Sequence, residues 1–261
     1  MSTQLEHSYR SDPETASAVL KAALYCWNHP NRGAAVKPRA FVTVSRQPGT
    51  GGRLFAHRLM ERLNEMPAGD WTAWDNELFD RISAEDPIEK QVLEALEQQP
   101  LTWLDEFVRG YSMKNGRHHM PELYAYKRIA MAIRALAEAG HTILVGRGSQ
   151  FVTDEMSGGI HVRLVAPIEH RIKYVAAKFN LSSHNAASRI AAADGDRQTF
   201  YRRFWAGKEI DPETFDATLN VAELCVNEMV ECVLPLIRAR EGVASVGLNA
   251  RQGPAAMAPP R

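Results

Sequence analysis

The feature that most limits the fold is a repeated change from short apolar, β-branched runs to helical patterns. The first run, residues 41–45, passes through a glycine-rich turn into a helix whose apolar residues share one face: Phe55, Leu59, Leu63 and Met66. Further apolar runs predict strands at residues 71–75, 141–145, 160–165 and 215–219. Strands that alternate with helices in this way predict an α/β fold, in which helices cover both faces of a parallel sheet.

Composition divides the chain into three parts. Residues 1–37 predict an N-terminal helical extension and linker. Residues 242–261, rich in Ala, Gly and Pro, predict a disordered tail. We therefore expect one domain at residues 38–241, with its clearest helix over residues 122–139 and a closing helix over residues 222–240.

Charge and cysteine content narrow the class of partner. Lysine plus arginine and aspartate plus glutamate each number 31, so no net field favours nucleic acid or an anionic membrane. The apolar runs are too short to span a bilayer, and residues 1–10 contain no signal core. Cys26, Cys225 and Cys232 lack C-x-x-C spacing, and the last two stand two helical turns apart, which predicts reduced, buried thiols. We expect a cytoplasmic protein that binds small molecules; the sequence does not indicate an oligomeric state.

The turn after the first strand carries the main functional signal. It reads Ser-Arg-Gln-Pro-Gly-Thr-Gly-Gly-Arg over residues 45–53. Glycines allow successive amides to point inward, and the following helix adds positive potential at its N-terminus. The turn therefore predicts a phosphate-binding loop built from Arg46, Gly49, Thr50, Gly51, Gly52 and Arg53.

Two kinds of phosphate-binding turn compete here. A dinucleotide fingerprint needs G-x-G-x-x-G, and Leu54 stands where its third glycine belongs, although Asp75 lies at a suitable distance for a ribose-binding acid. A Walker-type loop fits the length better but needs a lysine and then a hydroxyl after its last glycine. Gly52 and Arg53 take these positions if the last glycine is Gly51, and Arg53 and Leu54 take them if it is Gly52. Arg53 or Arg46 is the candidate for the missing cation, because a guanidinium binds phosphate well.

With this turn as the first of four segments, the sequence resembles the cytidylate kinase-like family of P-loop nucleoside monophosphate kinases. The other three segments are Ile-Leu-Val-Gly-Arg-Gly-Ser-Gln-Phe, His-Val-Arg-Leu-Val-Ala-Pro-Ile-Glu-His-Arg and Ala-Asp-Gly-Asp-Arg-Gln-Thr-Phe-Tyr-Arg-Arg-Phe, at residues 143–151, 161–171 and 193–204. The resemblance implies a P-loop NTPase-type three-layer fold with five parallel strands and a helical lid, placed at about residues 182–208. It also implies ATP with Mg²⁺ and a pyrimidine monophosphate acceptor such as CMP or dCMP.

Several charged residues follow predicted strands or lie in the predicted lid. Asp75, Arg147 and Arg171 are expected at the acceptor, because ligands bind beyond the carboxyl ends of parallel strands. Asp75 is equally placed to cap a helix, and Arg171 to form a structural salt bridge. In the lid, Arg197, Arg202 and Arg203 are the candidates to neutralise the transferring phosphoryl group. Asp194 is a candidate to orient an arginine or to contact a magnesium-bound water, and no metal ligand is assigned.

The sequence therefore leaves three functional hypotheses. In the first, the loop and Arg53 hold the ATP phosphates, Arg147 holds the acceptor phosphate, and the lid closes over both. In the second, the missing lysine and hydroxyl indicate a nucleotide-binding regulator, a pseudokinase. In the third, a kinase acts on another small acceptor, because Arg147 lacks the two flanking acids of the D-G-R-D loop in cytidylate kinases.

Overall fold

The computed structural model describes residues 39–67, 69–75, 120–206, 208 and 210–246. The predicted N-terminal extension lies outside these residues. The described elements, in chain order, are β1 Phe41–Arg46, α3 Gly52–Asn64, β2 Thr72–Trp74, α7 Met120–Ala139, β3 Thr142–Val145, α8 Ser149–Val152, β4 Gly159–Val165, α9 Ile168–Phe179, α10 Ser183–Phe204, a 3₁₀ turn Pro212–Thr214, β5 Ala217–Asn220 and α11 Val226–Val246.

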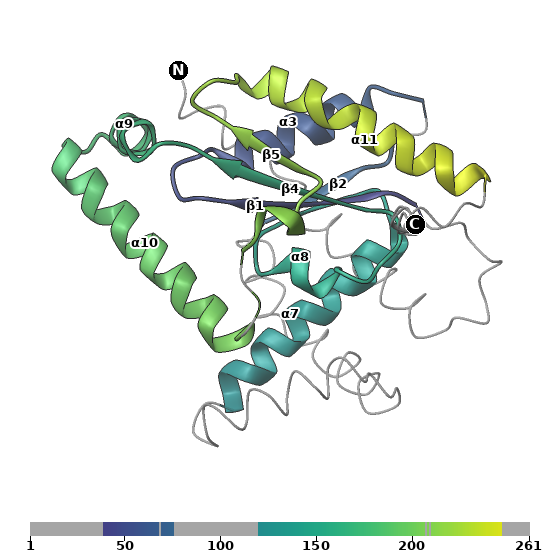
Figure 1. Cartoon of the computed structure of the whole chain (residues 1–261), viewed down its shortest axis with the longest axis horizontal. Coiled ribbons are helices and arrows are strands. Elements are labelled where there is room, and N and C mark those ends of the chain that lie inside the picture. The colour runs from purple at the N-terminus through teal and green to yellow at the C-terminus, as the bar shows by residue number, and fades with distance from the viewer. Residues whose placement is uncertain (1–38, 68, 76–119, 207, 209, 247–261) are drawn as a thin grey trace, which may run out of the picture.

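The five strands form one parallel sheet in the order β2-β3-β1-β4-β5. Helices α3 and α11 cover one face, and α7 and α8 cover the other (Figure 1). This arrangement confirms the α/β fold expected from the sequence. Because all strands run the same way, their carboxyl ends meet at one edge, where β1 turns into α3. Helix α10 stands beyond that edge, between α9 and α7 (Figure 1).

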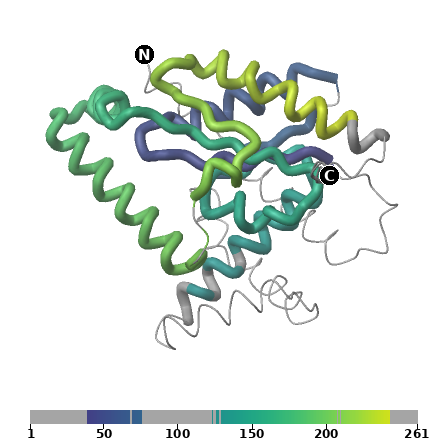
Figure 2. The backbone as a smooth tube through the Cα atoms, in the orientation of Figure 1, coloured from purple at the N-terminus to yellow at the C-terminus, as the bar shows by residue number. Residues whose placement is uncertain are grey.

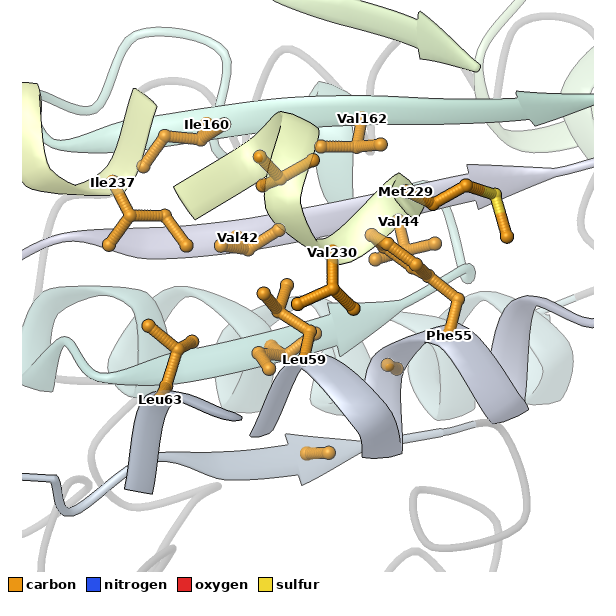
Figure 3. Close-up of a cluster of buried hydrophobic side chains, with 14 of the residues drawn as sticks. Val42, Val44, Phe55, Leu59, Leu63, Ile160, Val162, Met229, Val230 and Ile237 are labelled. Atoms are coloured by element: carbon orange, nitrogen blue, oxygen red, sulfur yellow. The ribbon is translucent and has the colours of Figure 1, made fainter. Parts of the chain in front are cut away.

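The core on the α3 and α11 face forms because every second residue of β1 and β4 points to it. Val42 and Val44 of β1 and Ile160 and Val162 of β4 are fully buried there. They pack against one apolar stripe on each helix, as Figure 3 shows, through Phe55, Leu59, Leu63, Met229, Val230 and Ile237. Each such side chain contributes about 1.5–3 kcal/mol when it leaves water, so this layer fixes where α3 begins.

The opposite face carries a second core, in which aromatic residues of α10 meet α7. Tyr126 of α7 lies 4.4 Å from Phe204 and 5.1 Å from Phe200, measured between ring centroids. Trp205, just after the helix, is buried in the same cluster. The C-terminal half of α10 is thus anchored to the domain, while its N-terminal half meets α9 (Figure 2).

The C-terminal segment differs from expectation at three points. The closing helix begins at Val226, because Asn220 Oδ1 accepts from Ala222 N and holds residues 220–222 in a turn. It continues to Val246, so the prediction of a disordered tail is wrong for residues 242–246. The prediction of buried thiols at Cys225 and Cys232 is also wrong. Both are exposed, since Cys225 precedes the helix and the buried face of the helix runs through Met229, Val230 and Val233.

Among the residues that the structure describes, no helix has both the length and the apolar character needed to cross a membrane.

Candidate functional site

The glycine-rich turn is held in shape by its own backbone and by β4. Gly49 and Gly51 adopt φ of +83° and +69°, which favour glycine. A Cβ at Gly49 would also stand 3.0 Å from the carbonyl oxygen of Arg171. The Gln47 side chain joins the turn to the end of β4, since its Oε1 accepts from Ala166 N at 2.9 Å. Buried Thr50 donates its hydroxyl to the Gln47 carbonyl at 2.8 Å, so this hydroxyl is engaged within the turn.

Three amides of this turn are left without an acceptor. The N–H groups of Gly49, Gly51 and Gly52 donate to no carbonyl within the described ranges. Gly51 is the N-cap of α3, and it supplies no side-chain cap. Unsatisfied amides at the start of a helix attract an anion, because the helix dipole adds to their partial positive charge. We call this row of open amides the cradle; that it binds phosphate stays a prediction.

Arg46, the last residue of β1, lies directly across this cradle. A Cβ built on Gly52 would come within 2.9 Å of Arg46 Cγ, and one built on Gly146 within 3.1 Å of its Nη2. The stem of the Arg46 side chain thus lies against Gly52 in the turn, and its guanidinium lies against Gly146 after β3. Arg46 makes no hydrogen bond or ion pair with any residue that the structure describes. Burial, and then the charge of Arg197, lowers its pKa from 12.5 to about 10.

Arg53 and Asp75 contact each other. Arg53 Nε lies 2.6 Å from Asp75 Oδ2, which joins the first turn of α3 to the end of β2. The Arg53 side chain is 45% exposed, and the Asp75 side chain is 19% exposed. The sequence placed one at the ATP phosphates and the other at the acceptor. The structure places them together at the rim of the cradle.

Arg147 stands in an unusual loop after β3. The residues Gly146, Arg147 and Gly148 have φ of +79°, +54° and +69°, so a non-glycine residue holds a left-handed conformation between two glycines. A chain of two hydrogen bonds fixes this loop. Trp205 Nε1 donates to Tyr126 Oη at 2.8 Å, and Tyr126 Oη donates to the Arg147 carbonyl at 2.8 Å. Burial raises the pKa of the Tyr126 phenol, which therefore stays a neutral donor.

Three residues predicted for the acceptor and the lid meet where α9 and α10 approach. Buried Arg171 donates from Nη1 to Asp194 Oδ2 at 2.9 Å, while Arg197 Nη1 lies 4.0 Å from Asp194 Oδ1. Arg197 Nη1 is buried, and it finds no hydrogen-bond acceptor in the described part of the chain. Burial lowers the pKa of Arg197. Asp194 thus orients two arginines, which is one of the roles predicted for it.

The other two lid arginines are not brought to this cluster. Arg202 is exposed, and its Nη2 donates to Thr199 Oγ1 on its own helix at 3.3 Å. Arg203 is half-buried and follows Arg197 by six positions, which turns it about 120° around the helix axis. Arg197 is near enough to Arg46 for its charge to lower the pKa of Arg46.

Sequence reasoning missed one arginine, Arg163 of β4. It pairs in register with Ser45 of β1, and its Nη1 donates to Ser45 Oγ at 3.5 Å. Its guanidinium carbon lies 5.4 Å from the centroid of the Phe215 ring. Burial, and then the charge of Arg197, lowers its pKa. The available signal was a permanent charge inside an otherwise apolar strand.

Across the described residues, no group of three His, Cys, Asp or Glu side chains is arranged to hold a metal ion.

The fold and this turn define an α/β protein with a glycine-rich turn of open amides at the carboxyl edge of its parallel sheet. The chain belongs to the cytidylate kinase-like family, whose model matches residues 41–223. The family indicates a nucleotide kinase-type function, and kinases of this kind use ATP and Mg²⁺.

Two further similarities add less. The fold resembles the crystal structure of an uncharacterized protein from Eubacterium ventriosum, with a TM-score of 0.60 and 16% sequence identity over 77% of this chain and 99% of that one. A stretch of 100 residues, 38% of this chain, is 24% identical to a uronate isomerase from Corynebacterium glutamicum. That stretch covers 19% of the isomerase.

Proposed function

We propose that the protein transfers a phosphoryl group from ATP to a nucleoside monophosphate, with a pyrimidine nucleotide such as CMP or dCMP as the first acceptor to test. One observation carries the proposal. The stem of the Arg46 side chain lies against Gly52, the last glycine of the cradle, its guanidinium lies against Gly146, and it has no ionic partner among the described residues. Its guanidinium would supply the positive charge that a lysine provides in a Walker-type loop.

The donor side follows from this arrangement. The amides of Gly49, Gly51 and Gly52 would hold phosphate oxygens of ATP, and Arg46 would neutralise the terminal phosphate. Arg53 would then act indirectly, by holding Asp75 at the rim. Mg²⁺ would arrive on the nucleotide phosphates and neutralise their charge. The described residues offer it no cluster of protein ligands, so no step is assigned to a residue that binds it.

The acceptor side uses Arg147 and the lid. Arg147, fixed after β3, would hold the acceptor phosphate, and Arg197 would reach the transferring group from α10. An acceptor phosphate oxygen attacks the γ-phosphorus, the bond to the bridging β-phosphate oxygen breaks, and ADP leaves. Clustered guanidinium groups stabilise the charge on the transferring oxygens, so positioning and charge neutralisation would provide the catalysis.

One observation favours a nucleotide-binding regulator as the second candidate. The Walker-type position for a magnesium-binding hydroxyl is taken by Arg53 or Leu54 in the two possible alignments of the turn. A protein that keeps the cradle but not this ligand would bind nucleotide without turnover.

An ADP-release assay with ATP, Mg²⁺ and a panel of nucleoside monophosphates separates the two candidates. We expect turnover, and we expect Arg197→Met to lower kcat about a hundredfold, whereas Arg202→Met on the exposed side of α10 stays within about twofold. Thermal stabilisation by ATP without ADP release would support the regulator. No affinity for any nucleotide would exclude both candidates.

A further inference from the structure

Arg163 is a cation that the proposed transfer does not use. Arg163 stands two positions after His161 in β4, so the two side chains point to the same face of the sheet. His161 packs edge-on against Phe41, which places this face on the side of α7 and α8. There it lies between Ser45 of β1 and the ring of Phe215, just before β5. Arg163 forms no ion pair with any residue in the described ranges. Asp216, which follows Phe215, is paired with Arg240, while Asp75 is paired with Arg53 and Asp194 with Arg171.

The lid places two further donors beside Arg163. Tyr201 of α10 is held over α8, where its ring lies 5.7 Å from that of Phe151 and its hydroxyl accepts from Gln150 Nε2 at 3.3 Å. Tyr201 and Arg197 are both near enough to shift the pKa of Arg163, Tyr201 upward and Arg197 downward. The same two residues act on Arg46. Arg163 and Arg46 are therefore both near this stretch of the lid.

The region around Arg163 holds several positively charged side chains. Like charges close together in a half-buried region repel each other, and each loses hydration. The proposed transfer assigns Arg46 to ATP, and Arg147 and Arg197 to the acceptor phosphate and the moving group. That assignment leaves Arg163 without an anionic partner among the described residues, and a further bound anion would offset its charge. Its planar guanidinium, with a serine and a tyrosine hydroxyl nearby, is suited to a phosphate or carboxylate group.

We infer that Arg163, Ser45 and Tyr201, closed over by Arg197, form a second anion subsite, which receives an additional acid group of the acceptor. This inference rests on the proposed function and deepens it. The acceptor then carries two acid groups, the phosphate that is phosphorylated and a further phosphate or carboxylate. A simple monophosphate with a neutral base would leave the subsite empty.

The subsite is tested by titrating the full chain with inorganic phosphate and, separately, with acetate, at constant ionic strength in chloride and with ADP filling the cradle. The signal is the Arg163 Nε–Hε NMR resonance, assigned by its loss in Arg163→Met. We expect this resonance to shift saturably in the wild type, and the Ser45 backbone amide resonance, present in both proteins, to show anion binding about tenfold weaker in Arg163→Met. The anion that binds more tightly identifies the acid group. The matched control is Arg189→Met, which removes an exposed lid arginine stacked on Phe179 at 4.1 Å and should stay within twofold.

The outcomes separate the two proposals. If ADP does not bind, the proposed function fails, and the same titration without ADP still tests Arg163. If neither anion shifts the Arg163 resonance beyond chloride, the second subsite is wrong, whatever the protein does with ATP. An acceptor screen completes the test. Phosphate monoesters with a second acid group should exceed size-matched monoesters without one at least tenfold in kcat/KM, and Arg163→Met should remove the difference. Equal kcat/KM values for the two groups in the wild type would overturn the assignment to the acceptor.

Discussion

The guanidinium of Arg53 lies 2.6 Å from the carboxylate of Asp75, and this ion pair closes the rim between α3 and β2. Arg46 has no such partner, although it lies over the cradle itself. The two arginines on either side of the turn thus have different tasks. One is used within the protein, and the other is available to a ligand.

The first prediction compares these two arginines. Arg46→Met keeps much of the side-chain stem but removes a charge-assisted contact worth about 1.5–3 kcal/mol, so the Kd for ATP should rise about ten- to a hundredfold. Arg53→Met removes a partly exposed ion pair and should change the Kd by about threefold or less. Isothermal titration calorimetry of both variants decides. A larger loss of ATP affinity in Arg53→Met than in Arg46→Met would show that Arg53, and not Arg46, supplies the positive charge at the cradle.

The second prediction concerns Gly52. A methyl group there would meet Arg46 Cγ at 2.9 Å, whereas the backbone at Gly52 is helical and accepts alanine. Gly52→Ala should therefore keep or slightly raise the free energy of unfolding, because alanine favours the helix by up to about 1 kcal/mol, yet weaken ATP binding by displacing Arg46.

A double-mutant cycle checks this explanation. In the Arg46→Met background, Gly52→Ala should have little further effect on the Kd for ATP, because the displaced side chain is already gone. Additive losses in the double variant would show that the methyl group acts on the cradle amides and not through Arg46.

Much of this site follows from the sequence, since strand–turn–helix order places the cradle at the carboxyl edge of a parallel sheet. Gly49 and Gly51, two glycines of the predicted phosphate-binding loop, have the positive φ that glycine favours. The position of the Arg46 side chain could not be predicted from the sequence. It depends on the register of β1 with β3, which pairs Val44 with Val145 and so brings Gly146 beside the end of β1.

Arg163 was missed for a different reason. A central strand is buried on both faces, so its sequence shows no alternation from which the direction of one side chain can be read. For the lid arginines, in contrast, the direction of each side chain follows from the sequence once the helix is known. Once the bounds of α10 are known, helical geometry alone separates Arg197 from Arg202, which stands five positions later and about 140° away around the axis.

The third prediction concerns the link between the lid and the Arg147 loop. Tyr126→Phe removes the hydroxyl that donates to the Arg147 carbonyl and accepts from Trp205. It should lower the free energy of unfolding by about 1–3 kcal/mol, since the buried Trp205 N–H loses its partner. It should also raise the KM for the acceptor more than the Kd for ATP, because the proposed mechanism assigns Arg147 to the acceptor phosphate alone. Urea denaturation and steady-state kinetics measure the two effects. Equal changes in both ligand constants would indicate general loosening and contradict this link.

The fourth prediction concerns His57, which lies on α3 one turn after Arg53. Burial lowers its pKa below 6.5, while the charge of Asp75 raises it, that of Arg53 lowers it and that of Glu61 raises it. Between the lowered native pKa and 6.5, the unfolded chain binds a proton that the native state does not. The stabilisation associated with neutral His57 is thus complete above pH 6.5 and is lost as the pH falls, with a slope of at most about 1.4 kcal/mol per pH unit. Other histidines titrate in the same range, so the relevant quantity is the difference between wild type and His57→Gln. Urea denaturation from pH 5 to pH 8 should show the two stability curves parallel above pH 6.5, with the wild type falling relative to the variant below it. Curves that stay parallel throughout would mean that His57 has the same proton affinity in the native and unfolded states.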